Sequence, residues 1–112
     1  MERIAVYGTL YNVVEDILKY DGTTWCGLLF NKWNVDILGK DKIKGYKKID
    51  FGLPYAIPDE NSEIEVWVIE VPIEFYRIIN EIEVEAGYTP VKVNTKYGKA
   101  TMYAYLKDDQ PI

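Results

Sequence analysis

Hydrophobic residues recur along the chain in short segments, and their spacing predicts several strands. Residues 3–8 form a brief apolar run that ends at Gly8, which is typical of a buried strand followed by a turn. Residues 64–68 alternate most clearly, and we expect this strand to be central in a sheet. Residues 35–51 alternate less regularly and contain Gly39 and Gly45, so they predict one long kinked strand or a pair of strands.

Two other segments place apolar residues at helical spacing. Asn12 is a candidate N-cap, with Glu15 at the third helical position as in a capping box, and this helix should end near residues 21–22. Pro72 is tolerated in a first turn and should open a second helix that runs to about Glu83. The predicted apolar faces are Val13, Val14, Ile17 and Leu18 in the first helix and Phe75, Ile78, Ile79 and Ile82 in the second.

The remaining segments are interpreted from their turn residues and from shorter patterns. Residues 24–33 fit either a helix or a strand, and the spacing of their large apolar residues favours a helix. Residues 52–56 and 58–61 have the composition of loops and turns. Residues 88–94 and 100–106 predict a closing hairpin.

The length and composition predict a single domain. With 112 residues, 48% of them hydrophobic, the chain can bury one ordinary core. Because the expected strands exceed the expected helices, we predict an α+β domain over residues 1–112, with a small mixed sheet curled toward a barrel and two or three short helices. No apolar run approaches the ~18 residues of a membrane span, and the N-terminus reads as a strand, so we expect a cytoplasmic protein without a membrane partner.

The charge balance argues against a nucleic-acid partner. Acidic residues outnumber basic ones by 18 to 13, which gives a net charge of −5. Binding to phosphates depends on clustered Lys and Arg, and the best basic stretch is residues 40–48. Five lysines in this stretch are interleaved with apolar residues, as on the solvated face of an edge strand.

Residue counts also restrict the possible chemistry. The chain has one cysteine, Cys26, and no histidine, which excludes an intrachain disulfide, a His-ligated metal, a Cys-His dyad and a Ser-His-Asp triad. Proton transfer would use a carboxylate, a lysine, a tyrosine or bound water. Of these groups only a carboxylate is readily tuned toward neutrality by burial.

Two local features are candidates for an active site. Gly8 lets the backbone approach a ligand closely, and the amides of Gly8, Thr9 and Leu10 can point at an anion. Glu83 falls on the apolar side of its predicted helix, where a hydrophobic residue belongs. Apolar surroundings raise the pKa of a carboxylate, as a general base working near neutrality requires. The competing interpretations are a purely structural turn and a helix-end carboxylate that reaches solvent.

Seven short motifs occur in order along the chain and together resemble one known family. They are Val6-Tyr7-Gly8-Thr9-Leu10, Gly45-Tyr46, Leu53-Pro54-Tyr55-Ala56, Glu65-Val66-Trp67-Val68-Ile69-Glu70-Val71, Ile79-Asn80-Glu81-Ile82-Glu83, Gly87-Tyr88 and Ala104-Tyr105. In this order they resemble the gamma-glutamylcyclotransferase-like family over most of the chain. The first motif is similar to the family's N-terminal signature, and the fifth is similar to its segment ending in the catalytic glutamate.

The resemblance implies a mixed barrel-like fold whose cavity binds a gamma-glutamyl substrate and releases 5-oxoproline, with no metal and no cofactor. Such an enzyme is of the lyase or acyltransferase type. Glu83 would take a proton from the substrate's α-ammonium, so that the amine attacks the γ-carbonyl, and would then protonate the departing amine. The expected substrate-binding residues are Tyr7, Gly8, Thr9, Leu10, Tyr55, Tyr88 and Tyr105, of which Tyr55 and Tyr105 are expected as aromatic walls of the pocket.

Departures from the family pattern leave alternatives open. Residues 89–90 are Thr-Pro where the family usually has an arginine, and residues 11–14 also depart from the pattern. Glu85 would be the functional carboxylate if the helix end were shifted, although helical phase and motif position favour Glu83. The alternative function is a binding protein that keeps the fold and the pocket without turnover, and that holds a small anionic metabolite or a protein partner.

Overall fold

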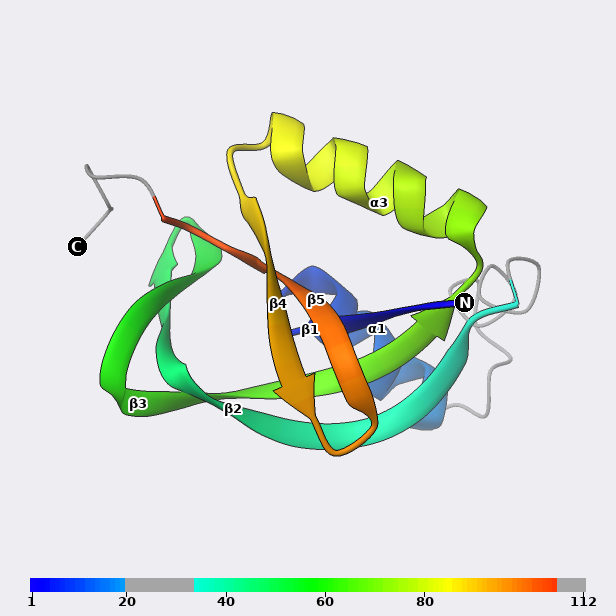
Figure 1. Ribbon diagram of the computed structural model, residues 1–112, viewed down its shortest axis with the longest axis horizontal. Helices are drawn as coiled ribbons and strands as arrows, with labels where there is room; N and C mark the ends of the chain where they lie inside the picture. Colours follow the sequence, from blue (N-terminus) through cyan, green and yellow to red (C-terminus); the bar gives the residue numbers. More distant parts are fainter. Residues whose placement is uncertain (20–33, 107–112) are drawn as a thin grey trace.

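The computed structural model describes residues 1–19 and 34–106, which form a five-stranded sheet and two helices (Figure 1). The strands are β1 (Glu2–Val6), β2 (Asp36–Phe51), β3 (Leu53–Val71), β4 (Thr89–Thr95) and β5 (Gly98–Ala104), and the helices are α1 (Thr9–Lys19) and α3 (Ile73–Glu85). This is the α+β fold class expected from the sequence. The helix predicted over residues 24–33 lies outside the described residues. No helix in the described ranges is long and apolar enough to cross a membrane.

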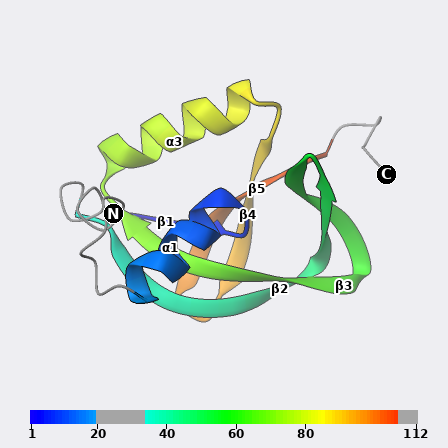
Figure 2. The ribbon, with the colours of Figure 1, turned by 180° about the vertical axis from the view of Figure 1, so that it is seen from behind.

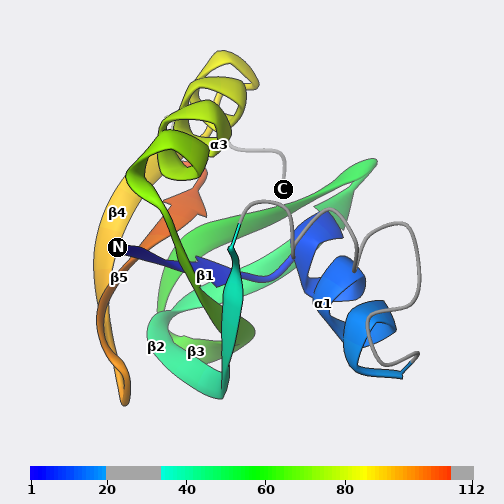
Figure 3. The same cartoon turned by 90° about the vertical axis from the view of Figure 1, so that its right-hand side faces the viewer.

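The strands are ordered β2-β3-β1-β5-β4 in one mixed sheet. β1 lies at its centre, antiparallel to β3 and parallel to β5. The described strand pairing leaves β2 and β4 as edges, so the sheet is curled but open, and the expected barrel-like sheet is corrected in this respect (Figure 1, Figure 3). Near the gap between the edges, a side-chain contact is made instead of a strand ladder: the amide of Lys96 donates to Asp41 Oδ2 at 2.9 Å.

Turn features are present at Gly52, which has a positive φ between β2 and β3, and at residues 59–62, which have no partner in β2 and where the amide of Asn61 donates to Asp59 Oδ1 at 3.0 Å. The loop predicted over the rest of residues 52–56 is wrong, because β3 begins at Leu53. Its first half pairs only with β2, in the register Pro54 to Asp50 and Pro58 to Tyr46. The amide of Ala56 points away from β2 and donates to Tyr7 Oη. Pro54 and Pro58 share the parity of Ala56, so the missing N–H groups of these prolines remove no bond from the ladder with β2.

Helix α1 begins before the predicted N-cap. The amide of Asn12 donates to the carbonyl of Gly8 at 3.3 Å, so Asn12 lies inside the first turn and Gly8 precedes it. Val14 and Ile17 are buried as predicted, whereas Leu18 is exposed.

Helix α3 begins after Pro72 as predicted, but its buried stripe is rotated. Phe75, Ile79 and Glu83, at four-residue spacing, lie on the covered side, whereas Ile78 and Ile82 are exposed. The helix covers the sheet along one narrow line, so only the residues on that line are withdrawn from solvent.

Buried residues gather on both faces of the sheet. Ile4 and Val6 pack under the helices with Val14 and Ile79. Ala5 and its alternate neighbours point to the other face and join the cluster within the curl. The two helices flank β1 (Figure 2, Figure 3). A strand covered on both faces needs a continuous apolar run, which is the pattern that residues 3–8 present.

Candidate active site

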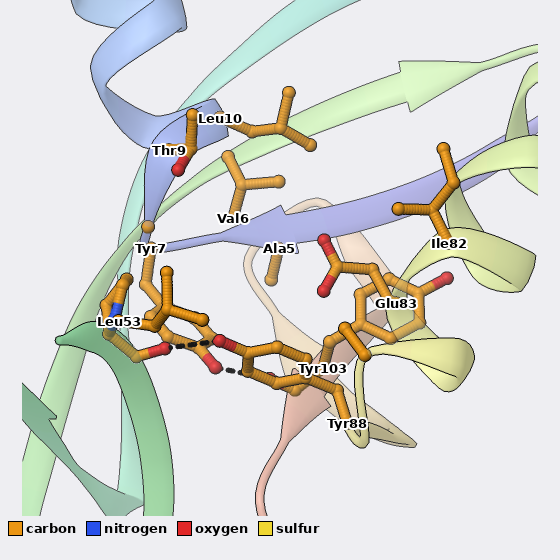
Figure 4. A pocket seen from close by; sticks show the side chains of 13 residues that line it. Ala5, Val6, Tyr7, Thr9, Leu10, Leu53, Ile82, Glu83, Tyr88 and Tyr103 are labelled. Atoms are coloured by element: carbon orange, nitrogen blue, oxygen red, sulfur yellow. Dashed lines mark hydrogen bonds between the residues drawn. The ribbon is translucent and has the colours of Figure 1, made fainter. Parts of the chain in front are cut away.

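A cavity of about 220 Å³ opens where β1 ends, between the start of α1 and the end of α3 (Figure 4). Its walls come from β1, α1, β3, α3 and β5 and from the turns beside them. The lining residues are Ala5, Val6, Tyr7, Gly8, Thr9, Leu10, Leu53, Pro54, Ile82, Glu83, Ala86, Tyr88 and Tyr103. Glu83 and the Gly8 to Leu10 turn, the two features that the sequence analysis named as candidates for an active site, therefore border one cavity although they lie far apart in the sequence.

The turn at Gly8 has no room for a side chain. A Cβ atom at this position would lie 2.8 Å from Cγ of Pro54, which belongs to the start of β3. The carbonyl of Gly8 accepts the first helical hydrogen bond of α1, so the amides of Thr9 and Leu10 lie in the first turn, where no intrahelical acceptor exists. Amides at a helix N-terminus attract anions.

The carboxylate of Glu83 extends from α3 toward β1 (Figure 4). It is half-buried, between the exposed Ile82 and Val84, one turn beyond the buried Ile79. Within the described part of the chain, no ion pair or hydrogen bond reaches this carboxylate, and burial raises its pKa. Glu83 is also the only charged residue among the described residues that line the cavity.

Hydrogen bonds of Tyr7 and Tyr103 join the strands and the helix that surround the cavity. The hydroxyl of Tyr7 donates to the carbonyl of Tyr103 and accepts from the amide of Ala56 at 3.1 Å, which joins β5 and β3 to the end of β1. The hydroxyl of Tyr103 donates to Asn80 Oδ1 at 3.1 Å, which fixes α3 one turn before Glu83.

The cavity tyrosines stay neutral at physiological pH. Tyr88, whose hydroxyl donates to the carbonyl of Pro54 at 2.8 Å, has its pKa raised to about 12, mainly by burial and further by the charge of Glu83. Burial also raises the pKa of Tyr7 and of Tyr103, and the charge of Glu83 again contributes. The tyrosines are therefore poor proton acceptors near neutrality, which leaves Glu83 as the lining residue suited to that task.

Three residues from the sequence analysis lie outside the cavity lining. The ring of Tyr88 forms the wall expected of Tyr55, which stacks on it with a centroid distance of 5.5 Å. Tyr105 packs edge-on against Tyr55 at 4.8 Å. Tyr55 and Tyr105 are therefore not walls of the cavity as expected. Tyr55 packs behind the ring of Tyr88, and Tyr105 packs against Tyr55. Glu85 is exposed and does not line the cavity.

Sequence reasoning did not select Tyr103, Pro54, Leu53 or Ile82 as site residues. Tyr103 could have been found from the alternation of the closing strand, because it lies two residues before Tyr105 and so on the same side of an extended chain. Of the two tyrosines only Tyr103 lies within β5, which ends at Ala104. The other three residues carry no chemical signal, and only the fold brings the start of β3 and the end of α3 to one cavity.

Comparisons with known proteins give one relative of substantial identity. No protein-family model matches the chain. The chain is 39% identical over 103 residues to the curated Pyrococcus horikoshii protein named "Putative gamma-glutamylcyclotransferase PH0828", an alignment that covers 92% of this chain and 78% of the relative. The crystal structure of PH0828 is similar with a TM-score of 0.72 and 35% identity, and the match covers 100% of this chain and 82% of that one.

Two more distant solved structures share the fold. A gamma-glutamyl cyclotransferase is 14% identical, with a TM-score of 0.59 over 93% of this chain and 66% of that one. An AIG2-like protein from Mus musculus is 15% identical, with a TM-score of 0.60 over 99% of this chain and 80% of that one.

Proposed function

The chain belongs to the gamma-glutamylcyclotransferase-like family, and from this membership and the cavity we propose that it is an enzyme that releases 5-oxoproline from a gamma-glutamyl amine or short peptide. The observation that carries the proposal is the position of Glu83. Its carboxylate has a raised pKa and borders the same cavity as the first amides of α1.

In the proposed reaction Glu83 transfers protons from the attacking nitrogen to the departing one. The ionised carboxylate takes a proton from the substrate's α-ammonium, and the freed α-amine attacks the γ-carbonyl carbon. A carbon–nitrogen bond forms within the new five-membered ring as the bond to the departing amine breaks. Glu83 then returns its proton to that amine, and the regenerated carboxylate passes the second proton of the ring nitrogen to the released amine, which leaves as an ammonium. No water, metal or cofactor is consumed.

The first turn of α1 would bind the negative groups of the substrate. The amides of Thr9 and Leu10 are suited to the α-carboxylate or to the oxyanion that develops on the γ-carbonyl oxygen. Where the family usually has an arginine, Thr89 opens β4 and Pro90 is exposed. In the described lining there is no cation to replace it, so we assign charge compensation to the helix N-terminus.

The test is release of 5-oxoproline from a panel of gamma-glutamyl compounds by the parent protein and by Glu83→Gln. Glutamine keeps the shape of the side chain but cannot accept and return a proton, so kcat should fall by about 10²–10⁴-fold while substrate binding changes much less. Glu85→Gln is the matched control, because it removes the same charge from an exposed position two residues away.

The outcomes separate the two functions considered for the fold. Full activity in Glu83→Gln, or a loss confined to Glu85→Gln, would contradict the role of Glu83. A parent protein that binds gamma-glutamyl compounds but releases 5-oxoproline from none of them would instead be a binding protein.

A further inference from the structure

The lining of the cavity divides by exposure into a floor and a mouth. Tyr7 and Tyr103 on the floor are each 6% exposed. Leu53, at the start of β3, is 54% exposed, and Ile82, near the end of α3, is 61% exposed, although both line the cavity. These two side chains come from separate elements and border the mouth.

Under the proposed function the substrate's reacting end lies between Glu83 and the first turn of α1. Glu83 and the amides of Thr9 and Leu10, which would hold the gamma-glutamyl group, are fixed by β1, α1 and α3. The leaving group is the part of the substrate that extends from that group. It would therefore reach the exposed side of the cavity, where Leu53 and Ile82 lie.

The chemistry of the mouth is apolar. Covering the exposed surface of Leu53 and Ile82 is favourable, and each methylene of a bound ligand that becomes buried is worth about a fourfold gain in affinity. A second carboxylate on the leaving group would meet no cation among the described lining residues, and it would lie near the negative charge of Glu83.

We propose that this cavity selects gamma-glutamyl substrates whose leaving group is an uncharged, apolar amine, with Leu53 and Ile82 as the specificity-determining residues. The inference rests on the proposed function and narrows it, because peptides and amino-acid conjugates carry a carboxylate on the leaving group whereas simple amides do not. The bonds that form and break are those already given.

A pair of substrates that differ by one group tests this inference. Gamma-glutamyl-3-methylbutylamide and gamma-glutamylleucine have the same leaving amine except for the α-carboxylate of leucine. We expect kcat/KM of the parent protein to be about tenfold higher for the 3-methylbutylamide, because only that leaving group can be covered without desolvating a charge.

Variants of α3 test whether Ile82 at the mouth of the cavity causes the preference for the 3-methylbutylamide. Ile82→Lys should lower the ratio of the two kcat/KM values by about threefold or more, because the new ammonium can pair with the carboxylate of the leucine conjugate. The ratio is the readout, since a lysine beside Glu83 can alter both rates together. Ile78→Lys is the control: Ile78 is also exposed on α3, four residues earlier, and does not line the cavity. Its ratio should equal that of the parent.

Equal rates on the two substrates, or a preference for gamma-glutamylleucine, would overturn the inference and leave the proposed function standing. An unchanged ratio in Ile82→Lys would also overturn the role of Ile82. Release of 5-oxoproline from neither substrate, nor from any other gamma-glutamyl compound, would overturn the proposed function and this inference with it.

Discussion

At the scale of single residues, Glu83 is an ionisable side chain at a half-buried position that would suit an apolar residue. It continues the buried line of Phe75 and Ile79 on α3, yet it is ionisable and has no hydrogen-bond or ion-pair partner within residues 1–19 and 34–106. Burial without a partner disfavours the charged form, which is why the pKa of this carboxyl is raised. The ionised carboxylate therefore lowers the stability of the folded protein at the position to which we assign proton transfer.

The raised pKa of Glu83 predicts how the stability of the protein depends on pH. The folded protein holds this proton more tightly than the unfolded chain, whose carboxyl has the ordinary value of 4.5, so the contribution to stability is present below that pH and is lost as pH rises through the folded pKa. Glu83→Gln should therefore gain stability relative to the parent as the pH rises above 4.5. Urea unfolding below and above this pH measures the difference.

Glu85→Gln provides the reference for that measurement, because it removes one negative charge from an exposed position of the same helix. If the two variants respond to pH in the same way, the effect comes from net charge and not from the burial of Glu83.

At the scale of secondary-structure elements, one close contact fixes the start of α1 against the start of β3. Gly8 approaches Pro54 so closely that an added Cβ would lie 2.8 Å from Cγ of the proline ring. The carbonyl of Pro54 also accepts the hydroxyl of Tyr88 at 2.8 Å. The same short segment of β3 therefore sets the position of the amide-bearing turn and of one aromatic wall.

Gly8→Ala should displace α1 or β3, because neither the helix start nor the proline ring can move by a simple rotation. We expect a loss of about 1–3 kcal/mol in the free energy of unfolding, as is typical of overpacking, together with weaker substrate binding. Thermal and urea unfolding with a 5-oxoproline assay would measure both effects.

A second substitution distinguishes this clash from a general effect of alanine. Pro54→Ala removes the contacting Cγ atom, so the double variant Gly8→Ala/Pro54→Ala should recover part of the stability that Gly8→Ala loses. Strictly additive losses in the double variant would contradict the contact as the cause.

At the scale of the whole molecule, the curl of the sheet brings β2 near the β4–β5 hairpin without forming a ladder between the two edges. The ring of Tyr97, in the hairpin turn, packs against the core cluster within the curl. Its hydroxyl lies where a side chain of Gly39 would be, since a Cβ there would be 1.9 Å away. The bulge of β2 at Gly39 thus makes room for the hairpin.

Gly39→Ala should force Tyr97 out of this position and loosen the hairpin. Gly45→Ala is the control, because Gly45 also has a positive φ, at a second bulge of β2, but faces open space. We expect Gly39→Ala to cost roughly 1–3 kcal/mol more than Gly45→Ala in the free energy of unfolding. Equal losses would mean that backbone strain alone, and not contact with Tyr97, explains both.

The elements that sequence predicted well are those whose signal is local. β1, the second half of β3, the kinked β2 and the closing hairpin all follow from alternation, apolar runs and glycine positions within a few residues. The start of α3 follows from Pro72. Helical phase also placed Glu83 on the inner side of its helix, because that phase depends only on the spacing of neighbouring residues.

Other features depend on contacts between segments far apart in the chain. Pro54 and Pro58 fit a strand only because their side of β3 lacks a ladder partner, and the turn before α1 is held close to β3 by the approach of Gly8 to Pro54. Ile82 was expected on the buried stripe, and a narrower contact with the sheet left it exposed at the mouth of the cavity.

The sequence by itself determined the fold class, the family resemblance and the two candidate site features, which are the Gly8 to Leu10 turn and Glu83. Each of these follows from a local pattern or from the type of residue at one position. Only the tertiary structure decided that Tyr88 and Tyr103 line the cavity while Tyr55 and Tyr105 do not, and that apolar side chains border its mouth. The physical reason is that a cavity is bounded by the packing of several elements at once, and no spacing along one element encodes what the next one presents to it.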